Sequence, residues 1–312
     1  MAGAAAGFML GRRMMDSPGP LPAQANIVIP HGGAAQVANV LWDAHALSGG
    51  TLTLRIGAFL TWRDGPLHAA EFAFPAHASL RQVLAVLRHA RPVDHYLTIP
   101  EGLTAQQIAG VFAEANAAIG DIPPIEEGSV LPETYSYELG TPRPVLLARA
   151  QAAMARALSD AWSNRAPDLP LASPRQAVIL ASIVERETSR PEERSHVAGV
   201  FLNRLKQGMR LQADPTVVYA VSGGAGTLDR KLARADLERD DKFNTYRSSG
   251  LPPAPICAPG LASIQAVLHP MQSDDLFFVA DGSGGHAFAR TLGEHELNVA
   301  RWRANRHQQN GG

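Results

Sequence analysis

SPRQAVILASIVERETSRPEERSHVAGVFLNRLKQGMRLQAD, residues Ser173–Asp214, is typical of two consecutive helices followed by a loop. Ser173 is a favourable N-cap residue and Pro174 suits the first helical position. The first helix should therefore begin here and run to about Thr188. A second helix should follow over residues 190–207, ahead of the loop that ends the stretch.

The first helix carries a carboxylate on its apolar side. Four residues fall on one stripe at helical spacing: Leu180, Ile183, Val184 and Glu187. If Glu187 is buried with this stripe, desolvation raises its pKa, as a general acid working near neutral pH requires. Periodicity alone favours the plainer alternative, in which Glu187 ends the stripe and reaches solvent or an arginine. Glu185 points the other way, beside Thr188, and is the less favoured acid.

The second helix and the segments after it supply further polar groups. Its buried stripe consists of Val197, Val200, Phe201 and Leu205. Four polar residues lie off that stripe: Arg194, Asn203, Arg204 and Lys206. Lys242–Pro259 holds four prolines and one glycine, and so rigid and polar a segment is expected to line a site.

The first third of the chain repeats a short pattern. The same order occurs three times: a short strand, a proline, a small or hydroxyl residue, and an amphipathic helix. The junctions between strand and helix are Ile29–Ala34, Phe74–Ser79 and Ile99–Thr104. Thr51–Phe59 alternates apolar and polar residues, which predicts a strand. These segments predict a small mixed α/β module.

The remaining segments complete an α+β fold. Pro144–Trp162 predicts an alanine-rich scaffold helix, and Asp275–Ala280 predicts a buried strand that turns through DGSGG into a hairpin. Leu292–Asn305 predicts a last helix. We therefore expect a module over 26–120, a mainly helical domain with a short sheet over 121–305, and a disordered tail over 306–312.

Composition excludes several classes of protein. The chain has 312 residues, 46% of them apolar, and a formal net charge of −1, so no basic surplus is present to bind nucleic acid. One cysteine excludes an internal disulfide and a cysteine-rich metal site. His269, His286 and His295 lack the spacing of a metal-binding pair on a helix. No Gly-rich phosphate loop or GxSxG nucleophile motif is present, and we expect no metal and no cofactor.

The N-terminus has a mixed character. Residues 1–13, MAGAAAGFMLGRR, are apolar and then basic, but the apolar run is shorter than the about 20 residues that span a bilayer. Residues 16–25, DSPGPLPAQA, predict a proline-rich linker. The alternatives for residues 1–25 are a truncated membrane anchor with its linker, or a disordered start.

Several long motifs resemble one family. ILASIVERET, VAGVFLNRLKQGMRLQADPTVVYAV, LARADLERDDKFNTYRSSGLPPAPICAPG and LFFVADGSGGHAFART are similar to motifs of the endolytic murein transglycosylases, the YceG-like family. IPEGLTAQQIA and LPETY also resemble it. The resemblance extends from about Ile27 to Arg303. It implies a LysM-like N-terminal module and a catalytic domain.

The resemblance also implies a mechanism. In lytic transglycosylases one glutamic acid protonates the oxygen between N-acetylmuramic acid and N-acetylglucosamine, and the muramic C6 hydroxyl closes on C1 to give a 1,6-anhydro end. The same carboxylate can then take the C6 proton. By resemblance this acid is Glu187, with Glu185 as the second choice. The implied substrate-binding residues are Thr188, Gln212, Asp214, Tyr219, Asn244 and Tyr246.

The resemblance implies partners and a location as well. The partners would be peptidoglycan glycan strands and peptidoglycan synthases, the penicillin-binding proteins. The protein would sit in the inner membrane by a single N-terminal helix, with its catalytic part in the periplasm. Two alternatives stay open: a catalytically silent peptidoglycan-binding scaffold, and a hydrolytic muramidase that uses a second carboxylate near Glu187.

Overall fold

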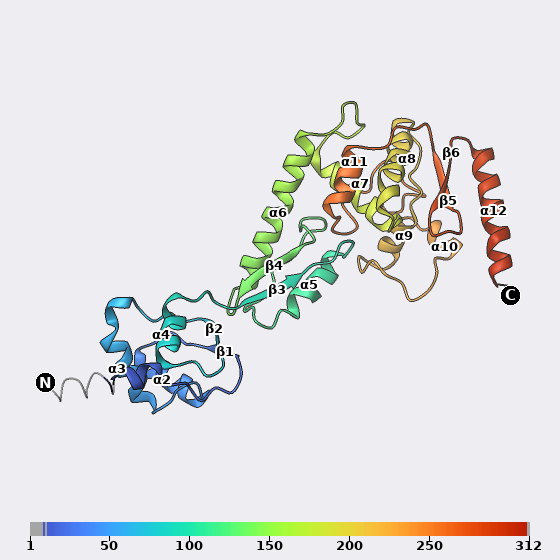
Figure 1. Ribbon diagram of the computed structural model, residues 1–312. Helices are drawn as coiled ribbons and strands as arrows, with labels where there is room; N and C mark the ends of the chain where they lie inside the picture. Colours follow the sequence, from blue (N-terminus) through green and yellow to red (C-terminus); the bar gives the residue numbers. More distant parts are fainter. Residues whose placement is uncertain (1–8, 10, 311–312) are drawn as a thin grey trace. The chain divides into compact units, whose positions relative to one another are not determined.

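The computed structural model describes residue 9 and residues 11–310, with side chains as far as Arg306. It has two compact units, each treated by itself below (Figure 1). Unit 1 holds the described residues up to Tyr96, with Ala117–Ile119 and Ser136–Thr141. Unit 2 holds Leu97–Asn116, Gly120–Tyr135 and the described residues from Pro142 onward. The mixture of helices and small two-stranded sheets confirms the α+β class.

The core of unit 1 is built from a two-stranded antiparallel sheet and the helical segments around it. Strands β1 (Ala25–Val28) and β2 (Glu71–Phe74) pair antiparallel, with Ala25 opposite Phe74. The helical segments are α2 (Ala34–Asp43), α3 (Thr51–Leu60), the short 3-10 helix η1 (Trp62–Asp64) and α4 (Leu80–His89). Phe72 and Phe74 are fully buried in the core between sheet and helices.

The predicted strand–proline–helix repeat is confirmed. Helices α2, α4 and α5 (Ala105–Ala113) follow strands β1, β2 and β3 (Asp94–Thr98) in turn. The hydroxyls of Ser79 and Thr104 each accept a hydrogen bond from the backbone of the third helical residue, whose glutamine side chain bonds back in a capping box. The LysM likeness of this region stays a prediction.

The predicted strand over Thr51–Phe59 is wrong, because this segment forms helix α3. Leu54 and Gly57 lie three residues apart, on one face of this helix, and both are buried. A Cβ at Gly57 would lie 2.9 Å from a methyl of Leu80 on α4, so glycine allows close helix packing. Packing against α2 and α4 therefore outweighs the strand preference of the threonines and Ile56.

The segment over residues 16–25 is not a free linker. Leu21 is buried in the unit 1 core, and the residue before the segment, Met15, is buried beside it. The Gly19 backbone donates a hydrogen bond to the His77 carbonyl, 3.1 Å away, and approaches Ala78 so closely that no side chain would fit. Residues 11–16 are helical, and the rest of the predicted apolar stub, except Met9, lies outside the described residues. None of the described helices has the length together with the apolar composition that crossing a bilayer would require.

Strands β3 and β4 (Thr134–Glu138) form a second two-stranded sheet, and the division between the units falls inside both strands. Unit 2 continues with α6 (Arg143–Ser163), α7 (Pro174–Glu187), the 3-10 helix η2 (Pro191–Glu193) and α8 (Arg194–Lys206). It ends with α9 (Asp214–Val221), α10 (Arg234–Leu237), α11 (Leu261–Leu268), strands β5 (Phe277–Ala280) and β6 (His286–Ala289), and α12 (Leu292–Asn310).

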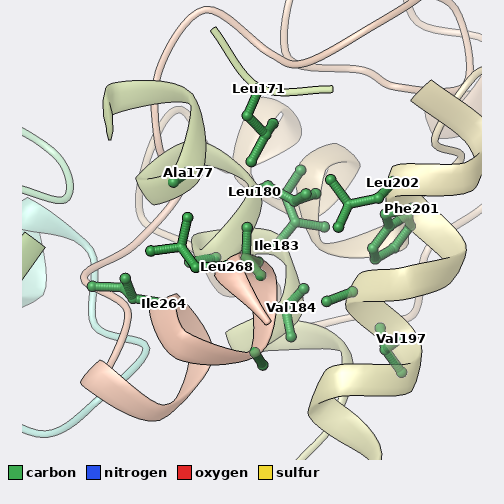
Figure 2. Close-up of a cluster of buried hydrophobic side chains, with 14 of the residues drawn as sticks. Leu171, Ala177, Leu180, Ile183, Val184, Val197, Phe201, Leu202, Ile264 and Leu268 are labelled. Atoms are coloured by element: carbon green, nitrogen blue, oxygen red, sulfur yellow. The ribbon is translucent and has the colours of Figure 1, made fainter. Parts of the chain in front are cut away.

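Helix α7 is the centre of unit 2. All eight residues from Ala177 to Val184 are buried, so α7 has protein on every side rather than one apolar stripe. Leu180, Ile183 and Val184 pack with Phe201 of α8 and Leu268 of α11 (Figure 2). The predicted start is confirmed, since the Ser173 hydroxyl accepts a hydrogen bond from the Gln176 backbone. Because the middle of α7 is packed on all sides, the position of its last residue, Glu187, is well defined.

Two helix boundaries and the burial of one strand differ from the predictions. Helix α8 starts at Arg194, four residues late, because Pro191–Glu193 forms a separate 3-10 turn. Strand β5 is only half-buried, since the two-stranded β5–β6 sheet leaves one face partly open. Helix α12 runs through Asn310, so most of the predicted tail is helical, and residues 311–312 lie outside the described part.

Candidate active site

A polar cavity of about 330 Å³ opens at the C-terminal end of α7. Its lining comes from α7, α8, the loop before α9, the Lys242–Pro259 segment, the β5–β6 hairpin and α12. The lining residues are Glu187, Arg204, Leu211, Gln212, Asp214, Tyr246, Phe278, Val279, Ala280, His286 and His295. The cavity therefore combines carboxylates, imidazoles, an amide, a phenol and a guanidinium in one small volume.

Glu187 is the last residue of α7 and lies at the wall of this cavity. Burial and, to a smaller extent, the nearby Asp214 carboxylate raise its pKa to about 8, even though the Arg204 guanidinium acts in the opposite direction. A carboxyl group with this pKa is largely protonated at neutral pH. Glu187 can therefore donate a proton to a group bound in the cavity.

Glu185, the alternative acid, faces away from the cavity. Its Oε1 lies 3.4 Å from an Arg194 nitrogen, and its Oε2 accepts a hydrogen bond from the Gly260 backbone at 2.9 Å. Only 5% of its side chain is exposed. These contacts use both carboxylate oxygens, so the structure gives Glu185 a role in holding α7 to α8 and to the start of α11.

Arg204 is buried, although the sequence placed it off the apolar stripe of α8. Its guanidinium donates to the Leu276 carbonyl at 2.6 Å and the Leu211 carbonyl at 2.7 Å. A weaker bond, at 3.4 Å, reaches Oε1 of Gln212. The side chain thus ties the loop before α9 to the segment before β5 and places a positive charge beside Glu187.

The predicted trio Gln212, Asp214 and Tyr246 is brought together. Gln212 adopts a φ of +52°, an uncommon value for a residue with a side chain, and its backbone donates to the Thr245 carbonyl. The Tyr246 hydroxyl donates to Oδ1 of Asp214 at 2.6 Å. Amide, carboxylate and phenol groups in this arrangement suit the hydroxyls and flat faces of sugar rings.

The other three predicted binding residues do not line the cavity. Thr188 is buried, donates to Glu193 and accepts from the Arg190 backbone, so it shapes the turn into η2. The Tyr219 hydroxyl donates to Glu127 instead.

Asn244 is completely buried and donates to the carbonyls of Leu237 and Arg239. Its Oδ1 accepts the Tyr246 backbone N–H, so Asn244 positions Tyr246 from behind. The amide of Asn244 thus holds the loop in shape and is not part of the cavity surface.

Sequence reasoning missed Arg204, His286 and His295 as cavity residues. His286 and His295 were considered only as metal ligands. No group of three or more His, Cys, Asp or Glu side chains within the described part of the chain is arranged to hold a metal ion. The only local signal for His286 was its position directly after the DGSGG turn, which says nothing about a partner 93 residues away.

A larger cavity, of about 720 Å³, lies between α6, η2, α8 and α11. It is lined mainly by alanines and uncharged polar side chains, with Asp160, Arg194 and His269 as the titratable groups. Glu187 and Asp214 do not line it. Size alone therefore does not make it the better candidate, because the raised-pKa acid belongs to the smaller cavity.

Comparison with known proteins identifies the family. Residues 27–301 match the model of the YceG-like family, so the chain belongs to that family. A crystal structure of a yceG-like protein from Listeria monocytogenes is 27% identical, with a TM-score of 0.54. It aligns with 88% of this chain, and 99% of that chain is covered. The resemblance inferred from the motifs is confirmed.

Two curated relatives carry the name endolytic murein transglycosylase. The Bacillus subtilis (strain 168) protein is 42% identical over 123 residues, which are 39% of this chain and 33% of the relative. The Streptococcus pneumoniae protein (serotype 2, strain D39) is 31% identical over 253 residues, 67% of this chain and 45% of the relative. The chain thus spans less than half the length of either relative.

Proposed function

We propose that this protein is an endolytic lytic transglycosylase. It cleaves the bond between N-acetylmuramic acid and N-acetylglucosamine inside peptidoglycan strands, leaves a 1,6-anhydro end and so terminates strand elongation. The observation that carries the proposal is Glu187, a glutamic acid kept protonated by burial at the wall of a polar cavity. Membership of the YceG-like family and the names of the two relatives support it.

In this proposal Glu187 gives its proton to the bridging oxygen as the bond to C1 breaks. The C6 hydroxyl oxygen then bonds to C1, and its proton passes to a base in the cavity. Gln212, Asp214 and Tyr246 hold the sugar hydroxyls, and the Asp214 carboxylate stabilises positive charge near C1. No metal or cofactor is needed for these steps.

A hydrolytic muramidase is the second candidate, because Asp214 is a second carboxylate in the same cavity. Such an enzyme would use Asp214 as nucleophile or base and water as the acceptor. The Tyr246 hydroxyl donates to Asp214 and lowers its readiness to attack, which favours the transglycosylase.

Product analysis tests the proposal. Purified peptidoglycan is incubated with the protein, and the fragments are identified by mass spectrometry. We expect fragments with anhydro-muramic ends, which are lighter by one water than reducing ends. Products with only reducing ends would establish the hydrolase, and the absence of fragments, together with retained binding to peptidoglycan, would establish the silent scaffold.

We further propose an inner-membrane location with the catalytic part in the periplasm, next to peptidoglycan synthases. The support is the resemblance, in which an N-terminal helix anchors the protein and a LysM-like module contacts glycan. Fractionation of cells that make the natural protein should place it with the inner membrane. Protease added to spheroplasts should then digest it, whereas protection from the protease would contradict the periplasmic orientation.

A further inference from the structure

His286 is held from behind by a carboxylate. It is the first residue of β6, and Glu193 of η2 accepts two of its hydrogen bonds. The His286 backbone N–H donates to Oε1 at 3.0 Å, and ring nitrogen Nδ1 pairs with Oε2 at 2.7 Å. Only 16% of the His286 side chain and 12% of the Glu193 side chain are exposed. The pair is therefore a largely desolvated unit beside the cavity.

The contacts of Glu193 fix which ring nitrogen carries a proton. Burial alone would raise the pKa of Glu193, but the hydrogen bonds from His286 outweigh burial and lower it. Glu193 is therefore a carboxylate, which can only accept, so Nδ1 of His286 is the donor. In a neutral ring Nε2 is then an acceptor. Because His286 lines the cavity and its Nδ1 edge faces Glu193, Nε2 is left for the cavity.

Three neighbours keep the pair in place. The Thr188 hydroxyl donates to Glu193 at 3.3 Å, directly after the acid-bearing end of α7. A Cβ at Gly285 would lie 2.5 Å from Glu193 Oε1, so the absence of a side chain there leaves room for the carboxylate. The ring of Phe278 stands edge-on to His286, with centroids 5.3 Å apart. The imidazole is thereby oriented before any ligand arrives.

We propose that His286, oriented by Glu193, is the base that takes the proton of the attacking C6 hydroxyl. This inference rests on the proposed transglycosylase function and assigns the second half of its proton transfer. As the C6 oxygen bonds to C1, its proton moves to Nε2, while the bond from C1 to the bridging oxygen breaks and that oxygen keeps the proton from Glu187. His286 then returns a proton to solvent and Glu187 takes one up, so the cycle has no net proton change.

The division of labour follows from the environments of the two groups. Glu187 is an acid that burial keeps protonated, whereas His286 is held by a carboxylate in the same cavity; separate environments of this kind mark an acid and a base. Charged and titratable groups of several elements lie around the cavity and around the Glu193–His286 pair. The cavity lining holds Glu187 on α7, Arg204 on α8, Asp214 at the start of α9, Tyr246 in the Lys242–Pro259 segment and His295 on α12. Arg190 pairs with Glu193 in η2, and Asp281 in the hairpin turn accepts from the Gly285 backbone next to His286.

The ratio of the two kinds of product end tests the inference. In His286→Gln the amide can still donate to Glu193 but cannot take up a proton at neutral pH. Ring closure should slow more than bond cleavage, so water competes for C1. We expect the ratio of anhydro to reducing ends to fall about tenfold or more. Glu193→Gln should lower the same ratio by a smaller factor.

His196→Gln is the matched control. His196 also pairs with a carboxylate, Asp275, at 2.8 Å, and stacks on Phe288, but it does not line the cavity. It should lose stability and keep the wild-type ratio of ends. An unchanged ratio of ends in folded His286→Gln overturns the inference. If that variant does not fold, an unchanged ratio in Glu193→Gln overturns it. Failure of the wild type to make anhydro ends would instead refute the proposed function.

Discussion

Glu187→Gln is expected to lower the rate of anhydro-end formation on the order of 1000-fold. The amide keeps the size and hydrogen-bonding reach of the side chain but has no proton to give to the leaving oxygen. Glycan binding should persist, because Gln212, Asp214 and Tyr246 are untouched. The measurement is the initial rate of anhydro-end formation from purified peptidoglycan, with binding followed separately by sedimentation with the polymer.

The same substitution should stabilise the protein. The pKa of Glu187 rises from 4.5 to about 8 on folding, so the folded state binds this proton more tightly than the unfolded state does. The resulting stability is fully present below pH about 4.5 and is lost as the pH rises through about 8. Glutamine carries no charge to desolvate, so at pH 8.5 the variant should gain about 4–5 kcal/mol in free energy of unfolding, and little at pH 5.

The rate of the wild-type enzyme should also depend on the protonation of Glu187. Because the acid must be protonated, the rate should fall above pH about 8 as Glu187 ionises. Glu185→Gln is the control two residues away, because its amide can still accept from the Gly260 backbone and it does not line the cavity. It should lose stability and keep most of its activity per folded molecule. The reverse pattern, an inactive Glu185→Gln and an active Glu187→Gln, would show that the wrong glutamate was chosen.

Local sequence signals predicted the frame of the site. The N-cap Ser173, the proline after it and the apolar stripe gave the start and the direction of α7, and so placed Glu187 at its end. Those signals act within one or two turns of helix, which is why they can be read without the fold. The prediction of a strand over Thr51–Phe59 was wrong because the period of its apolar residues is ambiguous. Packing against α2 and α4, which the local sequence does not show, makes this segment a helix.

Contacts that periodicity does not show account for what was missed. Thr188 and Asn244 have the chemistry of sugar-binding residues, but their partners are groups two to five residues away in irregular turns, whose bends helical or strand periodicity does not predict. His286 gains its partner Glu193 from another element of unit 2. Arg204 lies on the polar side of its helix by periodicity, yet the loop before α9 covers it.

Arg204→Met is expected to lower the free energy of unfolding by about 3–4 kcal/mol. Methionine keeps a long side chain against the ring of Phe277, over which the guanidinium lies at 5.3 Å. It leaves the carbonyls of Leu276 and Leu211 without their donor, and these groups are shielded from water. Urea titration measures the loss, and faster amide hydrogen exchange over residues 209–213 should accompany it, because the loop before α9 loses its anchor.

Arg204→Met should also change the pH dependence of the activity of the folded protein. The guanidinium lowers the pKa of Glu187, so its removal lets Glu187 stay protonated to higher pH and shifts the basic limb upward. Arg234→Met is the matched control, since Arg234 is 93% exposed and makes only a surface ion pair with Glu238. It should change neither stability nor pH profile measurably. A loss below about 1 kcal/mol in Arg204→Met, with unchanged hydrogen exchange over residues 209–213, would contradict this prediction. Water or a neighbouring side chain would then replace the guanidinium. The loop before α9 would be held in place without Arg204, by contacts such as those of Gln212 and Ala213 with Thr245.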